Sequence, residues 1–336
     1  MRVEWVDYAK GWSIVLVVSM HSALGVGLAV DGIGWLHPIV AFAKPFRMPD
    51  FFLVAGLFLG RAVDWPMRHY LDRKVLHFIY FYMLWTLIIL TVKSNDLGLA
   101  TPALFVRAYF WALVEPFSSL WFIQLLPVLF VVARTVQTLP LALTMAIGIA
   151  LHIAAALFPD GGIYAMSSAM TGWTTIDSFA LFLIYFLIGH FGRDSILAFA
   201  RLVVKRPALS IAGLLIWAIA EQAGVMWGLS EVPGLTILFG LAGGMAVVAV
   251  AALMSRAGVA PWLAYCGRHS LIIYLAFSIP MAATRIILLQ TSLVASVGWV
   301  SVIVAVVAIV APLVAERTLR DTRLSFFFHR PDWARI

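Results

Sequence analysis

The chain has 336 residues, of which 63% are hydrophobic and only 12% are charged, and its mean hydropathy is +1.00. This composition excludes an ordinary soluble globular domain and indicates a protein that lies in a lipid bilayer. The formal net charge is +7. Because Lys and Arg fall between apolar runs instead of gathering in one aromatic-rich patch, nucleic acid is not an expected partner.

Apolar stretches of about 20 residues, the length that a helix needs to cross a hydrocarbon core, recur along the chain. They predict an all-α, polytopic integral membrane helix bundle of about ten transmembrane helices. The predicted spans are 12–30, 36–60, 75–92, 119–137, 139–158, 176–191, 207–227, 235–254, 269–289 and 295–315. The stretch 101–115 is short and is interrupted by Arg107, which favours an interfacial or re-entrant element.

The basic residues predict how these spans are oriented. Placing both termini in the cytoplasm leaves only five of the 23 Lys and Arg residues elsewhere, namely Lys44, Arg47, Lys93, Arg107 and Arg285. The positive-inside rule therefore predicts a multi-pass protein of the cell (inner) membrane with two cytoplasmic termini. Residues 1–316 form the predicted transmembrane domain. Residues 317–336 form a basic cytoplasmic tail that either lies against the anionic inner leaflet or is solvated.

The first span places a histidine at mid-membrane depth. Lys10 lies at the predicted inner boundary, and His21 follows eleven residues later, about 16 Å along a helix axis. Ionisable side chains inside the membrane are costly, which makes each of them a candidate for function. Imidazole can take a proton from a hydroxyl, so His21 is a candidate general base. The alternative is a packed histidine bonded to a neighbouring carbonyl.

The second span carries three charged residues, Lys44, Arg47 and Asp50, whose spacing of three places them on one helical face. Measured from the outer boundary, Arg47 is also about 16 Å deep, so it can meet His21. Two prolines interrupt the same helix, which is tolerated where freed carbonyls face protein or a water-filled cavity. The pattern predicts a polar chamber, although a structural ion pair between Arg47 and Asp50 explains these charges equally well.

Further ionisable residues in later spans, Glu221, Arg285 and His152, either line the same chamber or pair between helices. The loop 61–77 is the densest cytoplasmic basic cluster. Its Arg and Lys suit the phosphates of a donor such as coenzyme A, and ordinary positive-inside charge explains them too. The histidines lack the spacing of a metal site, so no metal is expected.

Several segments resemble motifs of the membrane acyltransferase-3 family, especially its branch of fucose 4-O-acetylase-like sugar O-acetyltransferases. The first-span signature is similar to WVDYAKGWSIVLVVSMHS, in which Lys10 and His21 fill the basic and histidine positions. The segments FRMPDFFLVAGLFLGR, SSLWFIQLL and GRHSLIIYLAF are similar to motifs of the second, a middle and a late span. In YLDRKVLHF, which resembles a basic pair that opens the third span, Lys74 and His77 occupy the two positions. Many relatives end the late motif in His, whereas this chain has Phe277.

The resemblance implies transfer of an acyl group, often acetyl, from cytoplasmic acyl-CoA to a hydroxyl of a sugar, glycan or lipid acceptor on the far side. By this resemblance, His21 is catalytic and Lys10 handles the donor. The full set of predicted site residues is His21, Arg47 and Asp50 for catalysis, Lys10, Arg73, Lys74 and His77 for acyl-CoA (acetyl-CoA), and Lys44, Glu221 and Arg285 for the acceptor. A transporter or flippase is the alternative function, since mid-membrane charges and broken helices suit it as well. A catalytically silent family member acting as a membrane partner is a third.

Overall fold

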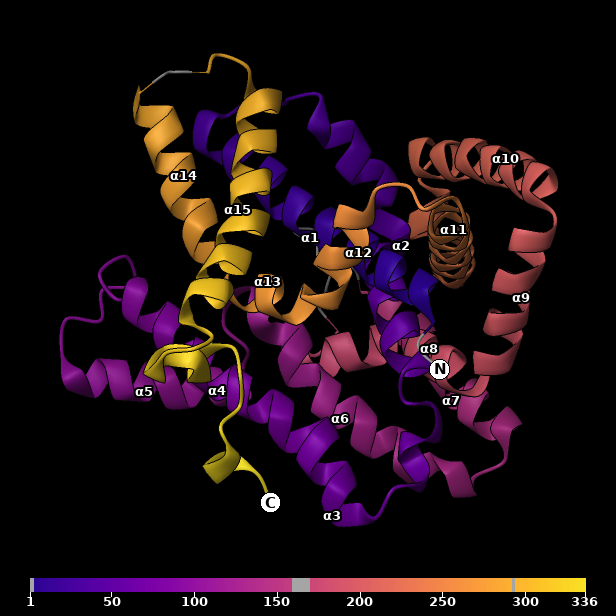
Figure 1. The fold of residues 1–336 in the computed structure, drawn as a ribbon, viewed down its shortest axis with the longest axis horizontal. Coiled ribbons are helices and arrows are strands. Elements are labelled where there is room, and N and C mark those ends of the chain that lie inside the picture. The colour runs from indigo at the N-terminus through magenta and orange to yellow at the C-terminus, as the bar shows by residue number, and fades with distance from the viewer. Residues whose placement is uncertain (1–2, 159–169, 292–293) are drawn as a thin grey trace.

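The computed structural model describes residues 3–158, 170–291 and 294–336, and the regular structure of these residues is entirely helical (Figure 1). The α-helices are α1 (Glu4–Val30), α2 (Leu36–Leu57), α3 (Met67–Tyr70), α4 (His77–Val92), α5 (Pro102–Val114), α6 (Trp121–Thr135), α7 (Leu141–Ala156), α8 (Thr174–Phe191), α9 (Arg193–Lys205), α10 (Pro207–Met226), α11 (Leu235–Ala257), α12 (Pro261–Arg268), α13 (Ser270–Ala276), α14 (Ser278–Thr291) and α15 (Val297–Leu319). A π-helical segment, Leu71–Leu76, joins α3 to α4.

Among the described residues, seven helical segments are long and apolar enough to cross a membrane. The number is eight when α13 and α14, which are bent by 55°, count as one broken span. Each of the ten predicted spans has a helical counterpart, but α2 and α7 are not among the helices that are long and apolar enough to cross a membrane. Helix α2 carries three charged residues, and α7 has only 16 residues. The prediction of an all-α, multi-pass membrane bundle is confirmed.

Helix α5 occupies the stretch that the sequence assigned to an interfacial or re-entrant element. Its 13 residues extend about 20 Å, which is too short to cross the hydrocarbon core alone. It lies beside α4 (Figure 1), where the Tyr82 hydroxyl donates to the Ala112 carbonyl and the Tyr109 hydroxyl donates to the Met83 carbonyl at 3.3 Å. The chain then turns into α6, so that Pro102–Thr138 forms one long apolar segment with a break inside it.

Helix α1 lies at the centre of the bundle, packed against α2, α11, α12 and α15, and α2 packs in turn against α8. The α2–α8 crossing is close because glycine faces backbone. A Cβ atom built on Gly189 of α8 would lie 2.0 Å from the Leu53 carbonyl oxygen of α2. Small residues at such crossings let membrane helices approach closely. This contact holds α2 and α8 on neighbouring sides of the cavity described below.

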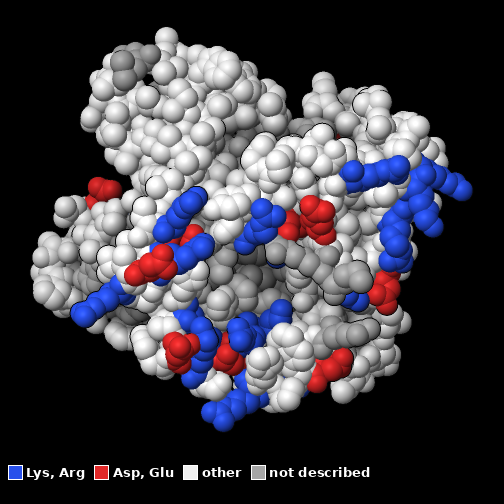
Figure 2. Space-filling view, in the orientation of Figure 1, with Lys and Arg blue, Asp and Glu red and all other residues white. Residues whose placement is uncertain are grey.

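The surface divides into charged and uncharged regions. Lys and Arg side chains follow α9 and gather over the C-terminal tail, whereas the surface over α14 and the upper part of α15 is uncharged (Figure 2). Helix α9 has an apolar buried face of Ile196, Ala200 and Val203, with Arg201 and Lys205 exposed. This amphipathic pattern is typical of a helix that lies along a membrane interface.

The tail beyond α15 folds back onto the protein. Arg330 is buried, its guanidinium forms an ion pair with the Asp72 carboxylate, and its Nη1 donates to the Asp72 carbonyl at 2.7 Å. Trp85 of α4 donates to the Phe327 carbonyl at 2.9 Å. This part of the predicted tail therefore packs against α4 and the π-helical segment, where the sequence suggested either a membrane surface or solvent.

Candidate active site

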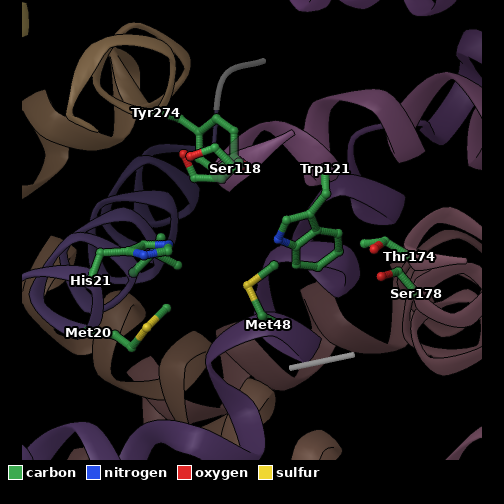
Figure 3. Close-up of a pocket in the computed structure, with 10 residues that line it drawn as sticks. Met20, His21, Met48, Ser118, Trp121, Thr174, Ser178 and Tyr274 are labelled. Carbon is green, nitrogen blue, oxygen red and sulfur yellow. Dashed lines mark hydrogen bonds between the residues drawn. The ribbon is translucent and has the colours of Figure 1, made fainter. Parts of the chain in front are cut away.

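His21 lines a cavity of about 330 Å³ that lies among α1, α2, α8, α13 and the turn preceding α6 (Figure 3). The polar and aromatic side chains that line it are His21, Ser118, Ser119, Trp121, Thr174, Ser178 and Tyr274, and the apolar ones are Val17, Met20 and Met48. In Figure 3, His21 and Trp121 lie on opposite sides, with the indole nitrogen of Trp121 toward His21. A mostly apolar cavity with a few converging polar groups is the expected form of a ligand site. We refer to it as the His21 cavity.

Helix α1 supplies three of these residues. Met20 and His21 follow Val17 by three and four positions, so the three side chains share one face of the helix. Lys10 and His21 both belong to this one helix. The helical rise then separates them by about 16 Å along the axis. The cavity thus lies at a fixed depth from the end of α1 that carries Lys10.

Two of the family-like motifs meet in the turn before α6. Phe117 is extended, and Ser118 has a φ of 61°, which is uncommon for a residue other than glycine. The Tyr274 hydroxyl, from α13, donates to the Ser119 carbonyl. This bond fastens the late motif to the middle motif, so that Trp121 and Tyr274 face the same cavity.

The imidazole of His21 packs against Phe277, with ring centroids 5.3 Å apart. Phe277 is only 1% exposed and stands where many relatives have a second histidine. Within the part of the chain that the structure describes, no hydrogen bond reaches the His21 ring nitrogens. His152 differs, since its two ring nitrogens bond the Leu181 carbonyl and the Thr236 hydroxyl, each at 2.7 Å. The structure thus makes His152 a packed histidine and leaves His21 available to a ligand.

Arg47 and Asp50 form no ion pair with each other within residues 3–158. The Ser13 hydroxyl donates to the Asp50 carboxylate, and Nη1 of Arg47 donates to the Val40 carbonyl at 3.3 Å. Arg47 lies within electrostatic reach of His21. Asp50 is fully buried and does not line the cavity. The structural alternative raised by the sequence, a mutual pair, does not form.

The predicted donor-binding residues lie together near the N-terminal end of α1. Nζ of Lys10 lies 3.7 Å from the centre of the Phe58 ring, and Nζ of Lys74 donates to the Phe58 carbonyl at 3.5 Å. Arg73 and Lys74 lie within electrostatic reach of His77. We call Lys10, Arg73, Lys74 and His77 the donor cluster.

Of the three predicted acceptor-binding residues, only Arg285 approaches the cavity. Its Nη1 donates to the carbonyl of Gly25, one turn beyond His21 on α1, at 3.1 Å. Lys44 instead pairs with Glu231 at 2.7 Å. Glu221 accepts a bond of 3.1 Å from the Trp217 indole and does not line the His21 cavity.

The hydroxyl residues of the cavity received no role from the sequence. Ser118 and Ser119 lie inside the motif SSLWFIQLL, which resembles a motif of the family. Their position in that motif is the one feature of the sequence that could have marked them as site residues. Thr174 and Ser178 are four positions apart near the start of a predicted span, which places them on one helical face. Small hydroxyl residues are common in membrane helices, so this spacing alone did not mark Thr174 and Ser178 as cavity residues.

A family model described as an acyltransferase domain matches residues 3–315. The chain therefore belongs to the acyltransferase-3 family and contains a membrane-embedded acyltransferase domain, as the motifs predicted. It is similar to the inner membrane protein YcfT of Escherichia coli (strain K12), with 25% identity in an alignment of 240 residues that covers 63% of this chain. The match spans 62% of the length of YcfT. No solved structure matches the chain at a significant level.

Proposed function

We propose that the protein transfers an acyl group, in the simplest case acetyl, from acyl-CoA to a hydroxyl of a carbohydrate or lipid acceptor. The observation that supports this best is the state of His21. It lines the cavity, its ring nitrogens accept no bond from the described residues, and the donor cluster begins eleven residues earlier on the same helix. A base, a cavity and a cationic donor end are thus arranged along α1.

The reaction needs a base that accepts one proton and returns it. A ring nitrogen of neutral His21 takes the proton of the acceptor hydroxyl while the hydroxyl oxygen attacks the thioester carbonyl carbon. The carbon–sulfur bond then breaks, His21 returns the proton to the sulfur, and coenzyme A leaves as the free thiol. The Ser119 and Ser178 hydroxyls line the cavity and can donate to the oxyanion that forms between these steps, and the positive charge of Arg47 acts on it from outside the lining.

The donor cluster is suited to the phosphates of coenzyme A. The ammonium group of Lys10 lies over the Phe58 ring, that of Lys74 donates to the Phe58 carbonyl, and Arg73 lies next to Lys74 in the chain. Cationic side chains of this kind bind phosphate through charge-assisted hydrogen bonds. The proposal places this end of the bundle, and both termini, on the cytoplasmic side of an inner membrane, where acyl-CoA is supplied.

The test uses purified protein in lipid nanodiscs, labelled acetyl-CoA and a cell-envelope extract as acceptor. We expect His21→Gln to lower thiol release and label transfer by about 10²- to 10⁴-fold, because glutamine cannot act as a base. His152→Gln is the matched control, since that histidine is held by two hydrogen bonds away from the cavity. Release that is equal in wild type and His21→Gln would contradict the proposal. Movement of an acceptor across the bilayer without thiol release would instead support a transporter.

A further inference from the structure

Two cations lie beyond His21, at the side of the cavity away from the donor cluster. Helix α1 runs from that cluster past His21 to Gly25, whose carbonyl accepts the bond from Arg285. Helix α4 likewise runs from the donor cluster to Lys93 at its far end. Lys93 lies within electrostatic reach of both His21 and Arg285. We call Lys93 and Arg285 the outer cations.

The outer cations are not neutralised by the described part of the protein. No carboxylate within residues 3–158, 170–291 and 294–336 comes within 4 Å of either one, although Asp96 acts on Lys93 from further away. Glu115, an acid beside the cavity-lining residue Thr174, accepts hydrogen bonds from the Thr174 backbone. Half-buried charges act more strongly than charges in bulk water, so this region attracts anions.

Other cations of the chain do have carboxylate partners. Lys44 pairs with Glu231, and Arg330 pairs with Asp72. Lys93 instead lies over the ring of Phe117, with Nζ 5.5 Å from its centre. Phe117 directly precedes Ser118, which lines the His21 cavity. The positive charge is therefore next to the place where an acceptor must bind.

Two hydroxyls in the cavity wall supply an independent observation. Ser119 and Ser178 are 7% and 1% exposed, both line the cavity, and their side-chain oxygens have no hydrogen-bond partner among the described residues. Buried polar groups are nearly always bonded, so these hydroxyls point to a polar ligand. With Trp121 and Thr174 in the same wall, the lining suits a hydroxyl-rich ring better than a hydrocarbon tail.

We propose that the acceptor is an acidic saccharide, whose carboxylate or phosphate binds Lys93 and Arg285 while its reacting hydroxyl lies at His21. This inference rests on the proposed function and narrows its acceptor class. Carboxylate and phosphate share the chemistry that the outer cations recognise, and the experiment below separates them.

The first experiment identifies the labelled product. Labelled acetyl-CoA and the envelope extract are incubated with the nanodisc protein, and the products are separated by anion exchange before and after phosphatase treatment. We expect label in the acidic saccharide fraction. Label that phosphatase moves to the neutral fraction indicates a phosphomonoester, and label that moves there only after carbodiimide coupling of carboxyl groups to a neutral amine indicates a carboxylate. Label in neutral saccharide or in lipid would overturn the inference and leave the proposed function intact. Absence of label in every fraction would overturn both.

The second experiment uses the isolated acidic fraction as acceptor. We expect Lys93→Gln and Arg285→Gln each to raise its KM about tenfold and to leave the KM of acetyl-CoA unchanged, with Lys93→Arg close to wild type. Lys44→Gln is the matched control, because that lysine is already paired with Glu231. If the outer cations hold a lipid headgroup instead, both KM values stay at the wild-type level in the Gln variants, and the inference fails.

Discussion

The ring of Phe277 fixes one side of the imidazole that the proposed reaction uses. The two residues are 256 positions apart in the sequence, yet their rings are in contact. The late motif indicated that position 277 is special because relatives have histidine there. Its partner could not be read from the sequence, because the contact depends on how α13 packs against α1.

We expect Phe277→Leu to lower kcat by up to about tenfold, since an aromatic pair contributes about 0.5–1.5 kcal/mol that leucine does not replace. The KM of acetyl-CoA should not change, because the donor cluster is untouched. Initial rates over a range of acetyl-CoA concentrations measure both values.

The control for Phe277→Leu is Phe186→Leu, which removes a buried aromatic contact with Phe130 elsewhere in the core. If the two variants lose activity in parallel with their loss of thermal stability, Phe277 has only a packing role.

At the scale of the helices, the crossing of α2 and α8 determines how far apart two walls of the cavity lie. Met48 comes from α2, and Thr174 and Ser178 come from α8. We expect Gly189→Ala to reduce the free energy of unfolding by about 1–3 kcal/mol, because the new methyl group overlaps the Leu53 carbonyl and forces the helices apart. The measurement is thermal unfolding in nanodiscs.

Gly213→Ala on α10 is the matched control, since nothing lies within 4 Å of the added Cβ atom there. That variant should be neutral or slightly more stable, because alanine favours a helix over glycine. Equal unfolding temperatures for Gly189→Ala and wild type would show that the crossing tolerates a wider separation.

The buried pair of Arg330 and Asp72 joins the tail to the π-helical segment that carries Arg73 and Lys74. Breaking a buried ion pair by removing one partner costs about 3–5 kcal/mol. Without Arg330 the Asp72 carboxylate keeps the Ile336 backbone N–H at 3.0 Å and Arg73 at 3.9 Å, so we expect a loss at or below the lower end of this range. We therefore expect Arg330→Met to lower the unfolding temperature and raise the KM of acetyl-CoA.

The double variant Arg330→Met with Asp72→Leu should recover part of both losses, because neither charge then remains buried alone. A double variant whose losses equal the sum of the two single losses would show that the residues act independently.

At the scale of the whole molecule, the sequence predicted the features that depend on the thickness of the bilayer, namely the helical class and the positions of the apolar spans. Apolar runs near 20 residues reveal spans because membrane thickness sets their length, and the resemblance located His21 and Lys10 on the first of them. The bend of 55° between α13 and α14 was not predicted, because the segment 269–289 has the length of a single span, although its Pro280 lies just after the bend. The pairing of Lys44 with Glu231 was not predicted either, because it depends on the packing of distant parts of the chain, whereas the bond from Trp217 to Glu221 joins positions i and i+4 of one helix.

Because Lys10 and His21 share the unbroken helix α1, that helix fixes the distance between the two residues that the proposed function assigns to the two ends of the donor. Eleven residues make about three full turns, so both side chains point to the same side. A single residue inserted between them would rotate His21 by about 100° and turn it away from the cavity, whatever residue is chosen. In this stretch of the chain, length is therefore constrained more strictly than composition.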